Sequence, residues 1–279
     1  MTQIRVVTDS ACDVPDDIAK RLGIDIVSLN IRFGDEEFVD RVDLTPSAFW
    51  AKCKSSKTLP ETSAPSPGAF QTAYERAKAD GCDGVIVLTL SAGLSATHQS
   101  ATIAAEAVAD QIDVRVIDTK AVSMAQGLVC IDVAEQAQKG ATLDELVTSA
   151  EILTTRIGVV AMLDTLEHLV KGGRIGGARA LVGQVLSIKP LLELKDGIVA
   201  EAGRQRTKAK ALTAIAEVTR SHAPLYRLAI VHGDSPDVNH LESLVADIPV
   251  ATELIVTDMG PVVGTHGGPG IIALCWIVA

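Results

Sequence analysis

The sequence predicts an α/β fold in two parts: a mostly parallel sheet with helices on both faces, then an α+β part with a largely antiparallel sheet. Aliphatic runs of strand length alternate with helical patterns as far as residue 155, which is typical of a parallel sheet. After residue 156, Asp196-Gly197 separates two strand-like runs, which indicates a tight hairpin. We therefore expect one domain over residues 1–155 and a second over residues 156–279, with 47% hydrophobic residues to fill two cores.

In the first part, the expected helices begin at recognisable capping residues. Thr45 precedes a proline at a first helical position, and Thr142 has the capping-box spacing from Glu145. The proline-rich segment 58–68 suits neither a helix interior nor a central strand, so we expect an extended loop there. The expected strands are 4–8, 24–29, 84–90 and 114–117, with a surface turn at 34–37, and the expected helices are 15–23, 45–50, 68–79, 101–108 and 123–138, with another from 142.

In the second part, the pattern of strands and helices is less regular. Residues 187–194 and 198–202 flank the predicted hairpin turn, and the glycine-rich stretch 172–177 precedes it. Hairpins mixed with helices are typical of an α+β arrangement. The remaining expected strands are 158–162, 225–231, 253–257 and 271–278, and the expected helices are 165–171, 208–221 and 236–246.

Charge, cysteine content and hydropathy exclude several classes of protein. A formal net charge of -10 argues against a nucleic-acid partner, which needs clustered Lys and Arg. The five cysteines are scattered without a C-x-x-C pair, which indicates buried thiols in a reducing compartment rather than disulfides or a zinc site. The start of the chain lacks a signal sequence, and no apolar run approaches the ~20 residues of a membrane span. We expect a cytoplasmic protein without a metal site or stable membrane insertion.

The stretch 84–100 is the clearest candidate for a binding site. A strand runs into a turn of small hydroxylated residues, and an alanine-rich helix follows at once. Unpaired backbone N–H groups and the positive end of the helix dipole make such a turn a site for an anion. Polar residues that end neighbouring parallel strands are expected at the same sheet edge: Asp9, Ser10, Ser91, Ser95 and Asp118.

A second candidate is the run 260–270, which concentrates glycines and prolines around His266 and predicts an irregular backbone path. One interpretation is a tight connection whose imidazole bonds a backbone carbonyl; the other is a site where glycines let a ligand approach closely. Arg174 and Arg206 also flank turns in this acidic chain, as part of a solvated face or as a site for a phosphate or an acidic partner. Because only 3% of the residues are aromatic, any ligand tunnel would have aliphatic walls, which suit a flexible hydrocarbon.

The sequence departs from the motifs of several enzyme classes. The segment 93–97 invites a nucleophile-elbow interpretation, but Thr97 stands where that motif has its last glycine. A serine esterase that uses Ser95 and His266 is the alternative function, and a regulatory module for another anionic metabolite is a third. The sequence has neither a dinucleotide-binding G-x-G-x-x-G after its first strand nor a Walker motif.

Several short motifs together resemble the DegV family, in that family's order and over essentially the whole chain. They are Thr8-Asp9-Ser10, Thr62-Ser63-Ala64-Pro65-Ser66, the run 90–97, Gly173-Arg174-Ile175, Lys189-Pro190, Arg206-Thr207-Lys208 and the run 260–270. The resemblance implies a carrier that buries a long-chain fatty acid and presents it to a separate ATP-dependent kinase, which makes an acyl phosphate for phospholipid synthesis. It implies no catalytic residue and no cofactor in this chain, apart from the fatty acid as ligand.

The resemblance also implies a role for individual residues. The fatty-acid carboxylate would be held by hydroxyls, backbone groups and an imidazole, and the two arginines would face the phosphoryl group or the kinase. The implied carboxylate ligands are Thr62 or Ser63, Ser95 with Ser91 and Ala96 beside it, and His266; the implied phosphate- or kinase-facing residues are Arg174 and Arg206. Ala64 and Ala96 replace the family's usual Gln and Gly, so the geometry around the carboxylate is expected to differ there.

Overall fold

The computed structural model describes residues 2–181 and 188–279 of the chain. The first sheet is parallel and has the strand order β2-β1-β6-β7. Its strands are β1 (Ile4–Asp9), β2 (Ile24–Val27), β6 (Gly84–Thr89) and β7 (Asp113–Asp118). All were expected from the aliphatic runs.

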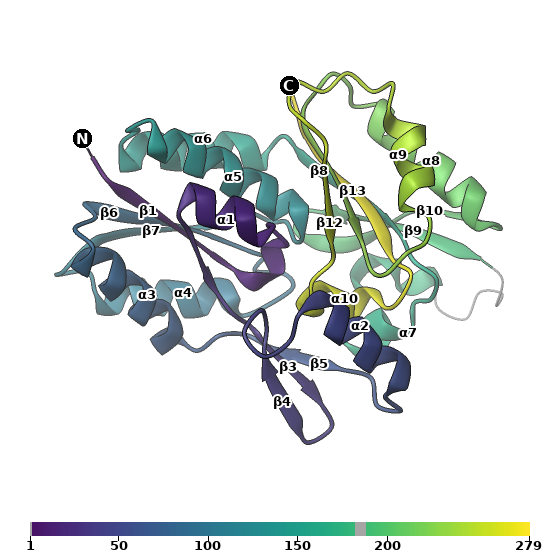
Figure 1. Cartoon of the computed structure of the whole chain (residues 1–279), viewed down its shortest axis with the longest axis horizontal. Coiled ribbons are helices and arrows are strands. Elements are labelled where there is room, and N and C mark those ends of the chain that lie inside the picture. Colours follow the sequence, from purple (N-terminus) through teal and green to yellow (C-terminus); the bar gives the residue numbers. More distant parts are fainter. Residues whose placement is uncertain (1, 182–187) are drawn as a thin grey trace.

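Helices cover both faces of this sheet, as predicted (Figure 1). α3 (Pro67–Ala79) and α4 (Thr97–Ala107) pack on the face that carries Val7 and Val87. α1 (Asp16–Leu22), α5 (Met124–Gln138) and α6 (Leu143–Thr154) pack on the face that carries Val6 and Ile86. Thr142 and Glu145 form the predicted capping box at the start of α6.

The second sheet is largely antiparallel, with the order β10-β9-β8-β13-β11-β12 and one parallel pair, β11 with β12. Its strands are β8 (Ile157–Met162), β9 (Lys189–Lys195), β10 (Ile198–Gln205), β11 (Leu225–His232), β12 (Ile255–Asp258) and β13 (Ile272–Val278). α8 (Lys208–Arg220) and α9 (Val238–Val245) cover one face. The two sheets confirm the predicted fold class, whereas the domain boundary at residue 155 stays a prediction.

The predicted hairpin turn is confirmed between β9 and β10. Asp196 and Gly197 both have positive φ, at 52° and 78°, which suits a two-residue turn whose twist matches the strands. The expected start of the first hairpin strand at Ser187 lies outside the described residues. Among the described residues no helix is both long and apolar enough to cross a membrane.

A small third sheet confirms a turn at residues 34–35, within the predicted surface turn, and contradicts the predicted loop at 58–68. β3 (Asn30–Phe33) pairs with β4 (Glu36–Val39) and with β5 (Glu61–Ser63), both antiparallel. β5 lies inside the segment expected to be a loop, because three residues between prolines are too few to show an alternating pattern. Its pairing places Thr62 opposite Ile31.

Most of the glycine-rich run 260–270 is not irregular, because it forms α10 (Pro261–Gly267). The predicted irregular path is confined to its end, where Gly268 and Gly270 have φ of 75° and 79°. Pro261 occupies the first helical turn, where its missing N–H has no cost. Gly264 lets α10 pack closely on α2 (Pro46–Ser55), since a Cβ there would lie 2.7 Å from ring atoms of both Phe49 and Trp50. Gly264 therefore serves the packing of α10 on α2.

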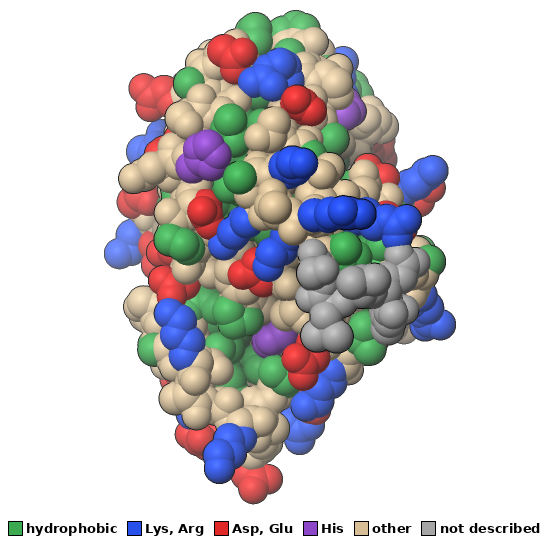
Figure 2. All heavy atoms as spheres, turned by 90° about the vertical axis from the view of Figure 1, so that its right-hand side faces the viewer, with side chains coloured by type: hydrophobic (Ala, Val, Ile, Leu, Met, Phe, Trp, Pro, Cys, Tyr) green, Lys and Arg blue, Asp and Glu red, His purple; other side chains and the backbone are tan. Residues whose placement is uncertain are grey.

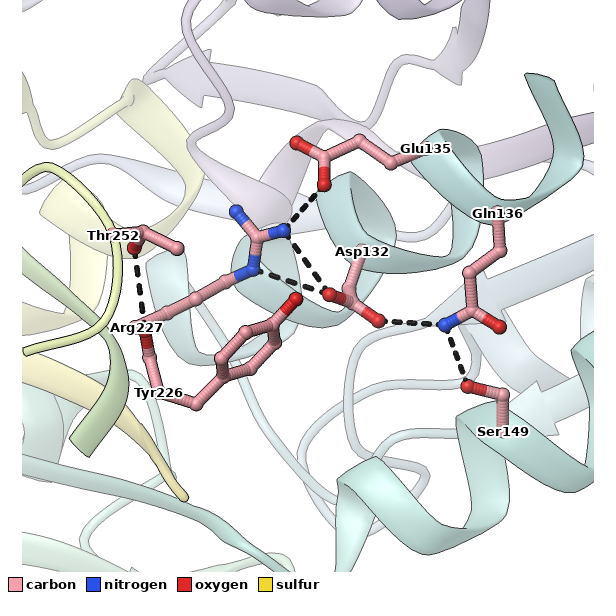
Figure 3. A network of polar contacts seen from close by, with 7 residues as sticks. All are labelled: Asp132, Glu135, Gln136, Ser149, Tyr226, Arg227 and Thr252. Atoms are coloured by element: carbon pink, nitrogen blue, oxygen red, sulfur yellow. Dashed lines mark hydrogen bonds and ion pairs between the residues drawn. The ribbon is translucent and has the colours of Figure 1, made fainter. Parts of the chain in front are cut away.

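The two large sheets share one continuous core that includes side chains from both, such as Ile86 and Cys275, and α5 lies between them in contact with β1 of the first sheet and with β11 and β13 of the second. A buried ion cluster crosses the same junction (Figure 3). Arg227 of β11 donates to Asp132 Oδ1 at 3.0 Å and to Glu135 Oε2 at 2.6 Å, both on α5. Because Arg227 is only 5% exposed, its charge depends on these partners.

Candidate functional site

An aliphatic cavity lies between the second sheet, α10 and the turn that joins β6 to α4. The volume open to the centre of a water-sized sphere is about 120 Å³. On the same measure a single buried water needs only ~10–15 Å³, so the cavity can hold a much larger molecule. Most of the lining side chains are Leu, Val, Ile, Ala or Met. The polar or charged residues in its lining are Thr62, Ser95, Ser123, Arg174, Glu193 and His266.

Thr62 and His266 meet at this cavity although 204 positions separate them in the sequence. β5 carries Thr62 and α10 carries His266, and the Thr62 Oγ1 to His266 Nε2 distance is 2.9 Å. Side chains alternate along a strand, so the neighbouring Ser63 points the other way and is exposed. Of the two residues proposed for this position, only Thr62 lines the cavity.

His266 is held as a neutral imidazole. Burial, with smaller contributions from the positive charge of Arg174 and from the imidazole of His168, lowers its pKa from 6.5 to about 4. Its Nδ1 is enclosed and has no hydrogen-bond partner among the described residues, while Nε2 faces Thr62. Because an enclosed acceptor without a partner costs less than an enclosed N–H, we assign the proton to Nε2. Thr62 then accepts from His266 and keeps its own hydroxyl hydrogen for a ligand.

Arg174 connects the two sides of the cavity's polar end. Its Nε donates to Leu94 O at 3.1 Å, in the turn before α4, and its Nη1 donates to Gly172 O at 2.6 Å, at the end of α7 (Glu167–Lys171). Two of the five guanidinium N–H groups are used in this way, which leaves others for an anion. Ser95 lies in the same turn, lines the cavity, and shares a 2.9 Å hydrogen bond with Thr97 Oγ1.

Not every residue proposed for the site reaches the cavity. Ser91 Oγ donates to Gly197 O at 2.7 Å and so joins the β6–α4 turn to the hairpin of the second sheet. Ala96 is exposed at the first turn of α4, and Arg206 is exposed just before α8. Neither these two residues nor Ser91 lines the cavity.

The polar residues at the ends of β1 and β7 do gather at the predicted sheet edge, where they fix the backbone. Asp9 is buried and accepts from Leu90 N at 2.7 Å and Ala11 N at 3.0 Å. Ser10 Oγ accepts from Leu29 N at 3.0 Å. Asp118 accepts from Ala92 N at 3.2 Å.

Two residues that the sequence analysis missed hold the site in place. Asp13 is buried and accepts from Ser123 Oγ at 2.5 Å and from Gly260 N at 2.9 Å, so it ties the start of α10 to the wall of the cavity. Burial raises the pKa of Asp13 to about 7, against the opposing effect of these two donors. Gly172 leaves room for the imidazole, since a Cβ there would lie 2.4 Å from His266 Nδ1. Asp13 is buried and has a positive φ of 53°, and neither property can be recognised from the sequence.

Ser95 and His266 do not form a nucleophile–base pair with each other. An esterase that uses Ser95 needs His266 as hydrogen-bonded base. The hydroxyl of Ser95 is bonded to Thr97, and Nε2 of His266 is bonded to Thr62. The arrangement suits an anion held by donors better than an activated serine.

The face shown in Figure 2 displays hydrophobic side chains in a hollow beside a histidine, with Lys and Arg side chains gathered above it. Fold and site together define an α/β protein with an aliphatic cavity whose polar end combines hydroxyls, a neutral imidazole and one guanidinium.

Comparisons place this protein in a family. The family model described as "Uncharacterised protein, DegV family" matches residues 3–279, so the chain belongs to the DegV family. A DegV domain-containing protein of Streptomyces coelicolor is 34% identical over 275 residues, 97% of each chain. The resemblance inferred from the motifs is confirmed.

Solved structures of two relatives have the same fold over their full length. One is described as "Fatty Acid Binding of a DegV family Protein from Thermus thermophilus", with a TM-score of 0.92, 34% identity and 100% coverage of both chains. The other is DegV of Bacillus subtilis, described as a fatty acid binding protein, with a TM-score of 0.90, 30% identity and 100% coverage of both chains.

Proposed function

We propose that this protein binds a long-chain fatty acid, with the tail in the aliphatic cavity and the carboxylate at its polar end. The observation that carries the proposal is the Thr62–His266 pair at 2.9 Å in the lining of a cavity that is mostly aliphatic. Ser95 and Arg174 complete the set of donors around the carboxylate. The fatty-acid binding stated for the relatives from T. thermophilus and B. subtilis supports the same ligand class.

The two ends of the ligand have different energetic roles. Burial contributes ~0.8 kcal/mol per methylene, so a long tail contributes on the order of 10 kcal/mol before the entropic costs of binding. An ionised carboxylate without partners would cost several kcal/mol on leaving water, so it needs good donors. Thr62, Ser95 and Arg174 supply hydroxyl and guanidinium donors at one end of the cavity. The tail therefore supplies affinity, and the polar end fixes the orientation of the ligand.

We further propose that a separate ATP-dependent kinase transfers the γ-phosphoryl group of ATP to this carboxylate, giving an acyl phosphate and ADP for phospholipid synthesis. An acyl phosphate is prone to hydrolysis, and a cavity that excludes water would protect it. Arg206 is exposed and lies outside the cavity lining, which suits contact with the kinase rather than with the tail. The chain itself then acts as a carrier without catalytic residues or a cofactor.

Native purification from a bacterial host followed by mass spectrometry of the denatured protein tests the binding step. We expect a co-purified long-chain fatty acid, and weaker retention in Ser95→Ala and His266→Ala, both of which keep the folded structure. A protein that carries no fatty acid and binds neither added palmitate nor oleate would contradict the proposal. Hydrolysis of a nitrophenyl ester that vanishes in Ser95→Ala would instead favour the esterase.

The role given to Arg206 has its own test. We expect Arg206→Ala to bind palmitate normally and to lower acyl phosphate formation by a fatty acid kinase with ATP at least about tenfold, the effect of losing ~1.4 kcal/mol of interaction. Arg21→Ala, which removes an exposed arginine from α1, is the matched control. Unchanged turnover in Arg206→Ala would remove this residue from the kinase-facing surface.

A further inference from the structure

The floor of the cavity is one face of the second sheet. On β8, Val159 and Ala161 line the cavity, while Val160 packs in the cluster beneath α8 and α9. On β13, Ala273 lines the cavity, while Leu274 belongs to that second cluster. This alternation places the two alanine side chains on the cavity side of adjacent central strands.

The two alanines form a shallow trough in the floor. Ala273 is the direct cross-strand partner of Ala161, so their side chains lie side by side. The same row continues to Leu192 on β9 and to Val231 on β11, both of them larger side chains. Leu192, Ala161 and Ala273 line the cavity, whereas Val231 does not. Along this row, the cavity therefore ends at Ala273.

The polar end of the cavity lies on the other side of the trough from Val231. The segments that carry Ser95 and Arg174 rest on the β9–β10 hairpin: a Cβ at Gly93 would lie 3.0 Å from Gly197 O, and one at Gly176 would lie 2.5 Å from Val199 O. In the sheet order, β8 and β13 follow this hairpin toward the sheet centre. A tail that extends from the polar end toward the centre crosses β8 first and β13 next, at a spacing of ~4.8 Å per strand.

We propose that Ala161 and Ala273 determine which acyl chain lengths this protein accepts, an inference that rests on the proposed binding of a fatty acid. A leucine at either position would occupy the trough and block the part of the tail beyond it. With bonds of ~1.5 Å in a staggered chain, one strand spacing corresponds to roughly four carbon atoms. Ala161→Leu therefore shortens the accepted tail by more than Ala273→Leu does.

The experiment measures the dissociation constants of octanoate, dodecanoate, palmitate and stearate for the full chain and its variants. We expect Ala161→Leu to weaken stearate and palmitate roughly ten- to a hundredfold, which corresponds to ~1.4 to ~2.8 kcal/mol of steric cost, and to weaken octanoate less than about twofold. Ala273→Leu should weaken stearate more than palmitate. Thermal unfolding is followed alongside, and Ala161→Val provides a smaller step if the leucine variant fails to fold.

Ala202→Leu is the matched control, because Ala202 packs on the opposite face of the same sheet. It should leave the order of affinities unchanged. Equal weakening of all four acids by Ala161→Leu, or no weakening of any, would overturn the inference while leaving fatty-acid binding intact. If the unsubstituted protein binds none of the four acids, the proposed function fails first and the inference fails with it.

Discussion

Replacing Thr62 by valine tests the polar end of the cavity with almost no change in side-chain volume. The variant loses one hydroxyl, whose oxygen lies 2.9 Å from His266 Nε2. With the proton assigned to Nε2, this hydroxyl accepts from His266 and keeps its own hydrogen for a ligand. The backbone of β5 tolerates valine, because β-branched residues suit strands. Any loss of affinity therefore reports on the hydrogen bonds and not on the fold.

The expected magnitude follows from two hydrogen bonds. The bond to an ionised carboxylate is worth ~1.5–3 kcal/mol, and its loss alone weakens binding about ten- to a hundredfold. The bond from His266 Nε2 is present without ligand too, so Thr62→Val leaves a buried N–H without a partner and lowers the free energy of unfolding by ~1–3 kcal/mol. Palmitate affinity should fall by the first factor, and the fold should persist.

The assay is a titration with palmitate by calorimetry, repeated with two other variants. Thr148→Val makes the same change on the exposed side of α6 and should leave the affinity within about twofold, because it loses only a hydrogen bond to Asp144 O. Ser63→Ala distinguishes the two neighbours that the sequence offered for this role. A palmitate affinity that is the same in Thr62→Val and Thr148→Val, or lowered in Ser63→Ala alone, would refute the assignment of Thr62.

Three further changes test how the site and the fold are held. Gly172→Ala places a Cβ 2.4 Å from His266 Nδ1 on a backbone (φ -72°) that suits alanine, so the imidazole must move: palmitate affinity should fall about tenfold in calorimetry, and unfolding should show an overpacking cost of ~1–3 kcal/mol. Arg227→Met leaves the buried Asp132 carboxylate without its cationic partner, and urea unfolding should show a free energy of unfolding lower by ~3–5 kcal/mol. Burial raises the pKa of Asp13 from 3.8 to about 7, so between about pH 4 and 7 the folded state holds a proton that the unfolded state releases. The free energy of unfolding then falls as pH rises, by ~1.4 kcal/mol per pH unit, and urea titrations of Asp13→Asn should lack that contribution.

Most of the fold was predictable because its signals are local. Capping residues such as Thr45 and Thr142, and the Asp196-Gly197 turn, specify a helix start or a hairpin within a few residues. β5 and α10 were missed because tertiary contacts decide them. β5 is an edge strand of three residues, and α10 forms where Gly264 meets the rings of α2.

The site was less predictable than the fold, since its parts come from distant segments. Neither Thr62 nor His266 carries a local signal that it meets the other, and only the family resemblance paired them. Asp13 supports the site because its carboxylate accepts from Gly260 N, and Gly172 supports it because its missing side chain leaves room for His266. Neither role produces a recognisable residue spacing in the sequence. The roles of the carboxylate-binding residues stay predictions until a ligand is measured.

The charges at the polar end fit a single anion. Glu193 lies opposite Val160 across the β8–β9 pair, so its side chain points away from the cavity with that valine, and Glu193 contributes backbone to the lining. His266 stays neutral above about pH 5 because its pKa is lowered to about 4. Arg174 is therefore the charged side chain that remains in the described lining, anchored by two backbone carbonyls but with N–H groups to spare. One fixed positive charge beside neutral donors balances one carboxylate, and a phosphoryl group added to that carboxylate would bring further negative charge that the lining does not offset. For the proposed kinase reaction, this charge balance predicts that acyl phosphate is held less firmly at this end than the fatty acid.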